Sequence, residues 1–234
     1  MGKINQYKHI FFDLDHTLWD YEKNSEEVLN ELFLKYQLEK LGVISCNQFQ
    51  ECFEHINKDL WNEFNKNKIN RDTIREQRFL RILNQFQIDD AELSSKLSDE
   101  YLMLCPTKPH LMPFTIEVLQ YLKENYQLHI LTNGFNDVQK IKLEKSNLHP
   151  YFATVVTSDS AGYKKPMTSI FKYAVEKADA RIEESIMIGD NLQTDILGAR
   201  NFGMDTVYYN PGKEKHKSRV THEIDCLSQL KTIF

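Results

Sequence analysis

The sequence has few cysteines and no long apolar run, and each shortage excludes a class of protein. Its 234 residues include four cysteines, none of which forms a C-x-x-C pair or a spacing typical of a metal site. No apolar stretch approaches the roughly 18 residues that a membrane span needs, and the first residues contain no apolar signal segment. We therefore expect a reduced, cytoplasmic protein with no membrane contact.

The sequence also lacks an excess of positive charge. Its formal net charge is −5 at pH 7, which argues against a nucleic-acid partner, because such an interface must neutralise many phosphates. One basic run, residues 212–219, is expected to be a mobile surface loop rather than a nucleic-acid contact. With 41% hydrophobic residues, the chain is long enough for a core domain and a smaller second one. We expect a monomer or a homodimer.

Residues 24–104 show the apolar spacing of four amphipathic helices. In the first, Val28, Leu32 and Tyr36 repeat every four residues, and the later helices carry similar stripes. The candidate capping boxes are Asn24-x-x-Glu27, Ser45-x-x-Gln48 and, more loosely, Asp89-x-x-Glu92. Short connections between such helices predict a bundle. Because the block follows the first expected strand, we interpret residues 19–107 as an inserted four-helix domain.

Outside that block, strands alternate with helices. The expected strands cover residues 9–12, 128–131, 153–157, 185–188 and 206–209, and the helices between them cover 115–125, 136–147, 168–178 and 193–201. The last of these helices is expected to end at Gly203. This alternation predicts an α/β fold with a doubly wound, Rossmann-like parallel sheet, formed by residues 1–18 and 108–234.

Polar side chains follow four of the expected strands. They are Asp13, Asp15 and Thr17 after the first strand, Thr132 and Asn133 after the second, Lys165 after the third, and Asp190, Asn191 and Asp195 after the fourth. In an open parallel sheet these strand ends share one edge, which is where ligands bind. The sequence therefore predicts one polar site at this edge.

The charges of this site indicate a metal ion and a reaction. Four carboxylates and one lysine would repel a phosphoryl dianion, and a bound Mg²⁺ removes this repulsion because it prefers carboxylate, carbonyl and water ligands. Two carboxylates with different tasks suit covalent phosphoryl transfer, in which one attacks phosphorus and the other protonates the leaving alcohol. A hydroxyl, a backbone N–H and an ammonium would hold the phosphoryl oxygens.

The ordered motifs resemble those of a known superfamily. Asp13-x-Asp15-x-Thr17, Thr132, Lys165-Pro166 and Gly189-Asp190 with Asp195 are similar to the four motifs of the haloacid dehalogenase superfamily. The likeness covers the whole chain, and the helical block resembles the C1 cap of that superfamily. The resemblance implies a hydrolase that acts on small phosphomonoesters with Mg²⁺.

The resemblance also implies a role for each motif residue. Asp13 would be the nucleophile and Asp15 the general acid/base, and Mg²⁺ would be held by Asp13, the backbone carbonyl of Asp15 and Asp190. The implied substrate-binding residues are Thr17, Thr132, Asn133 and Lys165, and the implied supporting residues are Asn191 and Asp195. Lys164 is a second candidate for the lysine, although the residue directly before the proline fits the superfamily better.

Two short stretches of sequence indicate a subgroup of this superfamily. Asp-Leu-Asp-His-Thr-Leu-Trp-Asp and Leu-Thr-Asn-Gly-Phe look most like bacterial pyrimidine 5′-nucleotidases that act on deoxyribonucleoside monophosphates. The alternatives are a 2-haloacid dehalogenase, a phosphoglycolate phosphatase and a sugar phosphomutase. Asp15 argues against the dehalogenase, which has no need of a second acid there. A non-enzymatic binding protein is disfavoured because no motif residue is missing.

Some residues of the helical block and its border are candidates for substrate recognition. Arg71, Arg75 and Arg78 follow one another at spacings of four and three, so they share a helix face. That face is either solvated or, through Arg75 or Arg78, in contact with substrate. Trp19 and Tyr21 either stack on a base or pack at the border between the domains.

Overall fold

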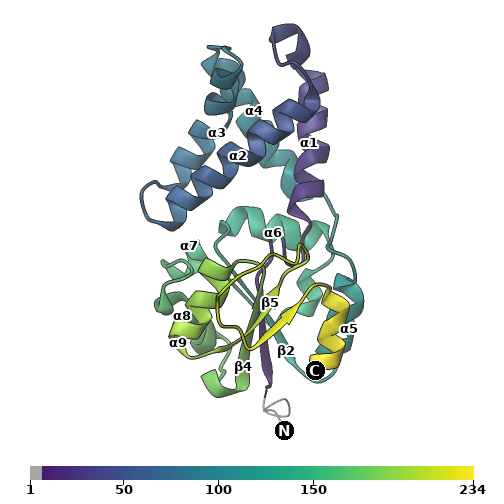
Figure 1. The fold of residues 1–234 in the computed structure, drawn as a ribbon, viewed down its shortest axis with the longest axis vertical. Helices are drawn as coiled ribbons and strands as arrows, with labels where there is room; N and C mark the ends of the chain where they lie inside the picture. Colours follow the sequence, from purple (N-terminus) through teal and green to yellow (C-terminus); the bar gives the residue numbers. More distant parts are fainter. Residues whose placement is uncertain (1–6) are drawn as a thin grey trace. The chain divides into compact units, whose positions relative to one another are not determined.

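The computed structural model describes residues 7–234 and divides into two compact units. One unit comprises the described residues up to Tyr21 together with Pro109–Phe234, and it contains the sheet (Figure 1). The other comprises Glu22–Lys108 and is helical. No helix of the described part is both long and apolar enough to cross a membrane.

The first unit is built on a six-stranded parallel sheet with the order β3-β2-β1-β4-β5-β6. The strands are β1 His9–Phe12, β2 Gln127–Thr132, β3 Thr154–Thr157, β4 Ser185–Gly189, β5 Asp205–Tyr209 and β6 His222–Ile224. The central strand β1 is wholly buried, and Phe12 pairs with Ile130 on one side and Ile188 on the other. The predicted α/β class is confirmed. The short strand β6 was not predicted, because its three residues carry no apolar run.

Helices cover both faces of this sheet. On one face, α8 (Thr168–Lys177) and α9 (Leu197–Phe202) bury Phe171 and Ala199 against Phe11 and Met187. Figure 1 shows α5 (Thr115–Lys123) on the opposite side, beside the C-terminal helix α10 (Leu230–Ile233). The remaining helices of this unit include α6 (Asn136–Lys145) and the short α7 (Ser158–Ala161).

The helix expected over residues 193–201 begins differently from the prediction. A π-helical turn covers Leu192–Ile196, and α9 follows it and ends at Gly203, whose φ of 93° is left-handed as expected for a glycine stop. The side chain of Asn191 accepts hydrogen bonds from the backbone N–H groups of Gln193 and Thr194. These bonds cap the turn, which is closed by the bond from the Ile196 N–H to the Asn191 carbonyl, and Asp195 lies within it.

The helical unit contains the four expected helices. They are α1 Tyr21–Lys35, α2 Cys46–Asn65, α3 Arg71–Gln85 and α4 Ala91–Leu104. Ser45 caps α2 and accepts from the backbone N–H of Gln48, as predicted. Two other caps were wrong: Asn24 lies inside α1, where it is buried, and α4 is capped by Asp90 rather than Asp89. Aromatic rings from three helices form the core, with contacts among Phe53, Phe79 and Tyr101.

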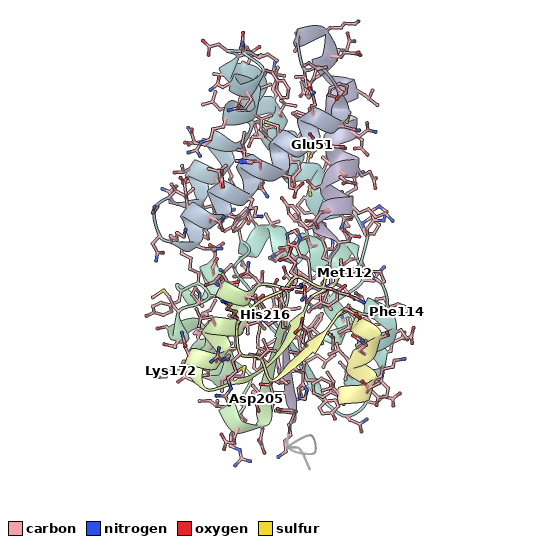
Figure 2. The ribbon with its side chains drawn as sticks, in the orientation of Figure 1. Glu51, Met112, Phe114, Lys172, Asp205 and His216 are labelled. Atoms are coloured by element: carbon pink, nitrogen blue, oxygen red, sulfur yellow. The ribbon has the colours of Figure 1, made fainter. Side chains whose placement is uncertain are left out.

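The basic segment 212–219 connects β5 to β6. Figure 2 labels His216, whose Nε2 lies 3.2 Å from Glu223 Oε2. Lys213 Nζ lies 2.8 Å from Asp225 Oδ2, and Asn210 donates to the Glu214 carbonyl. The segment is exposed, as expected, and these contacts with acidic residues anchor it to the sheet edge.

Candidate active site

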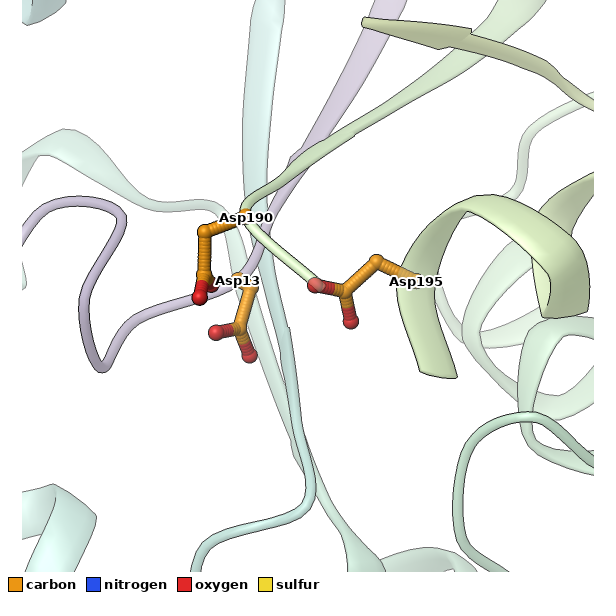
Figure 3. A group of neighbouring side chains, drawn as sticks. All are labelled: Asp13, Asp190 and Asp195. Atoms are coloured by element: carbon orange, nitrogen blue, oxygen red, sulfur yellow. The ribbon is translucent and has the colours of Figure 1, made fainter. Parts of the chain in front are cut away.

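Three carboxylates converge at the carboxyl ends of β1 and β4. Asp13 directly follows β1 and its N–H donates to the Ile188 carbonyl of β4, while Asp190 directly follows β4. One oxygen each of Asp13, Asp190 and Asp195 lies within 4.8 Å of the others (Figure 3). Hard oxygen ligands at this spacing fit a divalent cation such as Mg²⁺. The structure thus brings together three of the residues that the sequence predicted at this edge.

Lys165 lies beside this cluster of carboxylates. Its Nζ lies 2.6 Å from Asp13 Oδ1, 2.7 Å from Asp195 Oδ1 and 2.9 Å from the Leu131 carbonyl oxygen. The side chain is 2% exposed. A buried ammonium with three oxygen partners is held in a single geometry, and this arrangement favours Lys165 over Lys164 as the lysine that the sequence predicted.

The side chain of Asn133 forms hydrogen bonds with the backbone of Lys165. Its Nδ2 donates to the Lys165 carbonyl at 2.9 Å, and its Oδ1 accepts from the Lys165 N–H at 2.7 Å. The side chain was expected to bind substrate, but both of its amide atoms are engaged with the backbone of Lys165. Asn133 thus supports the lysine in this structure, while its contact with substrate stays a prediction. The amide reaches Lys165 because β2 and the loop after β3 are neighbours at this edge.

The two threonines of the motifs also have protein partners. Thr17 is fully buried and donates from Oγ1 to Asp190 Oδ1 at 3.0 Å, so it orients that carboxylate. Thr132 Oγ1 accepts from the Gly134 N–H and from Gln139 Nε2, both at 3.0 Å. The Thr132 hydroxyl thus stands at the end of β2 in a fixed position.

Asp15 lies among different partners from Asp13. Its Oδ1 is 2.5 Å from Lys142 Nζ, and its Oδ2 accepts from Gln139 Nε2 at 2.7 Å. Sequence reasoning missed Gln139 and Lys142. Both belong to α6 and lie three residues apart, hence on one face. In the sequence they appear only as a glutamine and a lysine shortly after Thr132-Asn133-Gly134, and the burial that distinguishes them is visible only in the structure.

The surroundings shift the pKa values of these acids in opposite directions. Burial raises the pKa of Asp13 to about 8, although Lys165 lowers it. Burial also raises the pKa of Asp190 to about 6, and the charge of Asp195 adds to the effect. For Asp15, burial raises the pKa, but Lys142 and Gln139 outweigh it and the net pKa lies below its ordinary value. These shifts separate the two carboxylates that flank Leu14.

For Lys165, burial lowers the pKa, but Asp13 and Asp195 outweigh it and the net pKa lies above the ordinary value. The ammonium is therefore charged throughout the neutral range.

Two of the candidates for substrate recognition, Arg78 and Trp19, have partners within the protein. Arg78 is 4% exposed, so a solvated face was the wrong expectation for it; its guanidinium lies over the rings of Phe53 and Tyr101. Recognition of substrate by Arg75 or Arg78 stays a prediction. Trp19 is fully buried, and its ring centroid lies 4.1 Å from Lys142 Nζ, which favours packing over stacking on a base.

Comparison with known proteins agrees with this geometry. Residues 10–209 match the haloacid dehalogenase-like hydrolases. The pyrimidine 5′-nucleotidase PynA of Streptococcus pneumoniae is 31% identical, with 95% of this chain and 96% of that protein aligned. The pyrimidine 5′-nucleotidase YjjG of Escherichia coli is 29% identical, with 86% of this chain and 85% of that protein aligned.

A solved structure is similar over the same extent. The crystal structure of the HAD-hydrolase YfnB from Bacillus subtilis, bound to magnesium, has a TM-score of 0.87 and 28% identity, and the comparison covers 97% of this chain and 98% of that one. The family resemblance and the expectation of a hydrolase are confirmed. This chain belongs to the haloacid dehalogenase-like hydrolase family.

Proposed function

We propose that this protein is a Mg²⁺-dependent phosphatase that hydrolyses small phosphomonoesters through an aspartyl-phosphate intermediate. The observation that carries the proposal is the contrast between two carboxylates after β1. Asp13 lies with Lys165 and the other acids, whereas Asp15 is held by Gln139 and Lys142. Two neighbouring carboxylates in such different surroundings suit two different tasks.

In the first step, a carboxylate oxygen of Asp13 attacks phosphorus and the bond to the ester oxygen breaks. Asp15 gives a proton to that oxygen, which leaves as the alcohol. Asp15 is ionised in the substrate-free protein, but the approaching phosphoryl dianion favours its protonated form, because like charges oppose ionisation. The hydroxyl of Thr132 and the ammonium of Lys165 hold phosphoryl oxygens as charge moves.

In the second step, water attacks the phosphorus of the aspartyl phosphate. Asp15 is now the base: it takes a proton from the water, the bond between Asp13 and phosphorus breaks, and phosphate leaves. Asp13 is thereby restored as a carboxylate. Asp15 returns to the protonated form that the next first step requires.

The cluster of Asp13, Asp190 and Asp195 fits the metal that this chemistry needs. When bound, Mg²⁺ would be held by Asp13, Asp190 and the backbone carbonyl of Asp15, and would offset the negative charge that otherwise repels the substrate. Thr17 fixes the orientation of Asp190 for this task. Asp195 contacts Lys165 and keeps the ammonium beside Asp13.

The substrate we propose is a nucleoside 5′-monophosphate, with pyrimidine deoxynucleotides preferred. PynA and YjjG, which align with most of this chain, are both named pyrimidine 5′-nucleotidases. A phosphoglycolate phosphatase or a sugar phosphomutase would use the same attack by Asp13. A 2-haloacid dehalogenase needs no second acid, so the hydrogen bonds that Gln139 and Lys142 donate to Asp15 disfavour that reaction.

The test is phosphate release from a panel of phosphomonoesters, each with Mg²⁺ and with EDTA. The panel contains dUMP, dTMP, UMP, AMP, phosphoglycolate, sugar phosphates and p-nitrophenyl phosphate. We expect Mg²⁺-dependent release with the highest kcat/KM for the deoxypyrimidine nucleotides. Asp13→Asn should abolish release, because an amide cannot attack phosphorus, while the exposed control Asp99→Asn should match the wild type.

Each other outcome removes part of the proposal. Release without a deoxypyrimidine preference would refute the nucleotide substrate and leave the phosphatase. Full activity after exhaustive chelation would refute the metal requirement. An absence of release from every ester would refute the phosphatase, and activity of folded Asp13→Asn would refute the nucleophile.

A further inference from the structure

We infer that Gln139 and Lys142 are positioning residues for catalysis, which together hold the Asp15 carboxylate in one orientation and tie it to Thr132. This inference rests on the proposed function, because it assigns Asp15 the proton transfers. It adds two residues from α6 that belong to none of the motifs by which the site was found. The pair is referred to below as the acid clamp.

The acid clamp donates a hydrogen bond to each carboxylate oxygen of Asp15. Lys142 Nζ lies 2.5 Å from Oδ1, and Gln139 Nε2 lies 2.7 Å from Oδ2. With one donor on each oxygen, the plane of the carboxylate cannot turn without breaking a hydrogen bond. A proton donor must point at the leaving oxygen when the ester bond breaks, so a fixed plane favours transfer.

Gln139 also connects Asp15 to the phosphate-binding side of the site. The same Nε2 donates to Thr132 Oγ1 at 3.0 Å, and the side chain is fully buried. One amide nitrogen therefore holds a residue that transfers the proton and a residue that contacts the phosphoryl group.

The buried ammonium of Lys142 lies between the Asp15 carboxylate and the ring of Trp19. Its side chain is 5% exposed, and Asp15 is its one ion-pair partner within the described chain. The ring of Trp19 lies against the ammonium, with Nζ 4.1 Å from the centroid. A buried ammonium with one carboxylate partner is unlike a surface lysine, whose charge water would satisfy.

Gly134 provides the room that Gln139 occupies. A Cβ at position 134 would lie 1.9 Å from Gln139 Nε2 and 2.4 Å from its Cδ. Any side chain there would force the amide away from both Asp15 and Thr132. Gly134→Ala is therefore a way to break one half of the acid clamp without changing a charge.

The experiment compares an ester with a poor leaving group against one with a good leaving group. The substrates are the best nucleotide of the panel, whose alcohol needs a proton, and p-nitrophenyl phosphate, whose phenolate leaves unaided. The variants are Gln139→Leu, Lys142→Met and Gly134→Ala, with Lys142→Arg as the conservative change. Lys140→Met is the matched control, since Lys140 is exposed on the same helix.

The clamp variants should lose kcat on the nucleotide by on the order of 10-fold or more, since general acid–base catalysis contributes about 10²–10⁴-fold. They should lose much less on p-nitrophenyl phosphate, with KM nearly unchanged. Lys142→Arg should recover part of the loss, and Lys140→Met should match the wild type. In an Asp15→Asn background, Lys142→Met should cause no further loss, because the lysine acts through Asp15.

Two results would overturn the inference. One is an equal loss on both substrates, which marks a general structural defect; the other is a full additional loss from Lys142→Met in the Asp15→Asn background. If Lys142→Met fails to fold, Gln139→Leu and Gly134→Ala decide the question by the same comparison. A wild type that releases no phosphate from any ester would refute the proposed function, and this is distinguishable because it is measured before any variant.

Discussion

A buried histidine pair in the sheet makes the stability of the first unit depend on pH. His129 lies in β2 and is fully buried; its Nε2 is 3.1 Å from His9 Nδ1, and its Nδ1 is 2.9 Å from Thr154 Oγ1. The ring stacks on Phe11. Burial, helped by the charge of His9, lowers the pKa of His129 from 6.5 to about 4. Folding therefore favours the neutral ring.

The sign and size of the effect follow from this difference. Between pH 6.5 and 4 the unfolded chain binds a proton that the folded chain does not, so the free energy of unfolding falls as the pH falls. The full effect is present above pH 6.5. One pKa unit corresponds to about 1.4 kcal/mol, so the whole window is worth about 3 kcal/mol, and about 2 kcal/mol is lost between pH 7.5 and pH 5.

Urea unfolding of the wild type and of His129→Gln, measured from pH 7.5 to pH 5, tests this. Trp19 is buried in the same unit, so its fluorescence in a Trp61→Phe background reports on the unfolding of that unit. The wild type should lose about 2 kcal/mol more than His129→Gln over this range. Carboxylates of the active site are common to both proteins and cancel in the difference. Parallel pH profiles would refute the reasoning.

Three further predictions concern the active site. Lys165→Met should abolish activity and lower the free energy of unfolding by about 3–5 kcal/mol in urea, because Asp13 and Asp195 lose a buried partner; a change under about 1 kcal/mol would contradict the pairing. Mg²⁺ at 100 times its Kd should stabilise the protein by about 2.7 kcal/mol in thermal unfolding, and Asp190→Asn should lose most of this shift. Gly189→Ala should lower kcat on the order of 10²-fold, because its Cβ would lie 2.3 Å from Asp195 Oδ2. Gly212→Ala is the control and should leave kcat unchanged, because its Cβ would lie 3.6 Å from the nearest atom.

The parts of the structure that were predictable are those with a local cause. Each motif residue follows a strand that an apolar run reveals, and parallel strands place their carboxyl ends at one edge. Asp13 and Asp190 could therefore be placed together from the sequence. Ser45 could be identified as a cap because its partner Gln48 is three residues away. In each case the position of the residue follows from its spacing to a neighbouring strand or helix in the sequence.

The parts that were not predictable depend on partners far away in the chain. Thr17 orients Asp190, which is 173 residues distant, and Asn133 holds Lys165 across 32 residues. From the sequence both resemble substrate contacts, because a hydroxyl or an amide at a strand end has no visible partner. Arg78 was ambiguous for the same reason: the helical spacing gives its face but not the rings of Phe53 and Tyr101 that lie against it.

The most informative omission is that of Lys142, because the site contains two buried lysines and sequence reasoning found one. Lys165 pairs with Asp13, and Lys142 pairs with Asp15, two residues further on. A buried ammonium persists only beside an opposite charge, so each lysine is tied to its own carboxylate. Asp195 and Asp190 oppose the charge of Asp13, whereas Gln139 adds a donor to Asp15. Neighbouring aspartates thereby acquire opposite pKa shifts in the substrate-free protein. The proposed roles need the reverse, an ionised Asp13 and a protonated Asp15, so the mechanism requires a bound cation to lower the pKa of Asp13 and the phosphoryl dianion to raise that of Asp15.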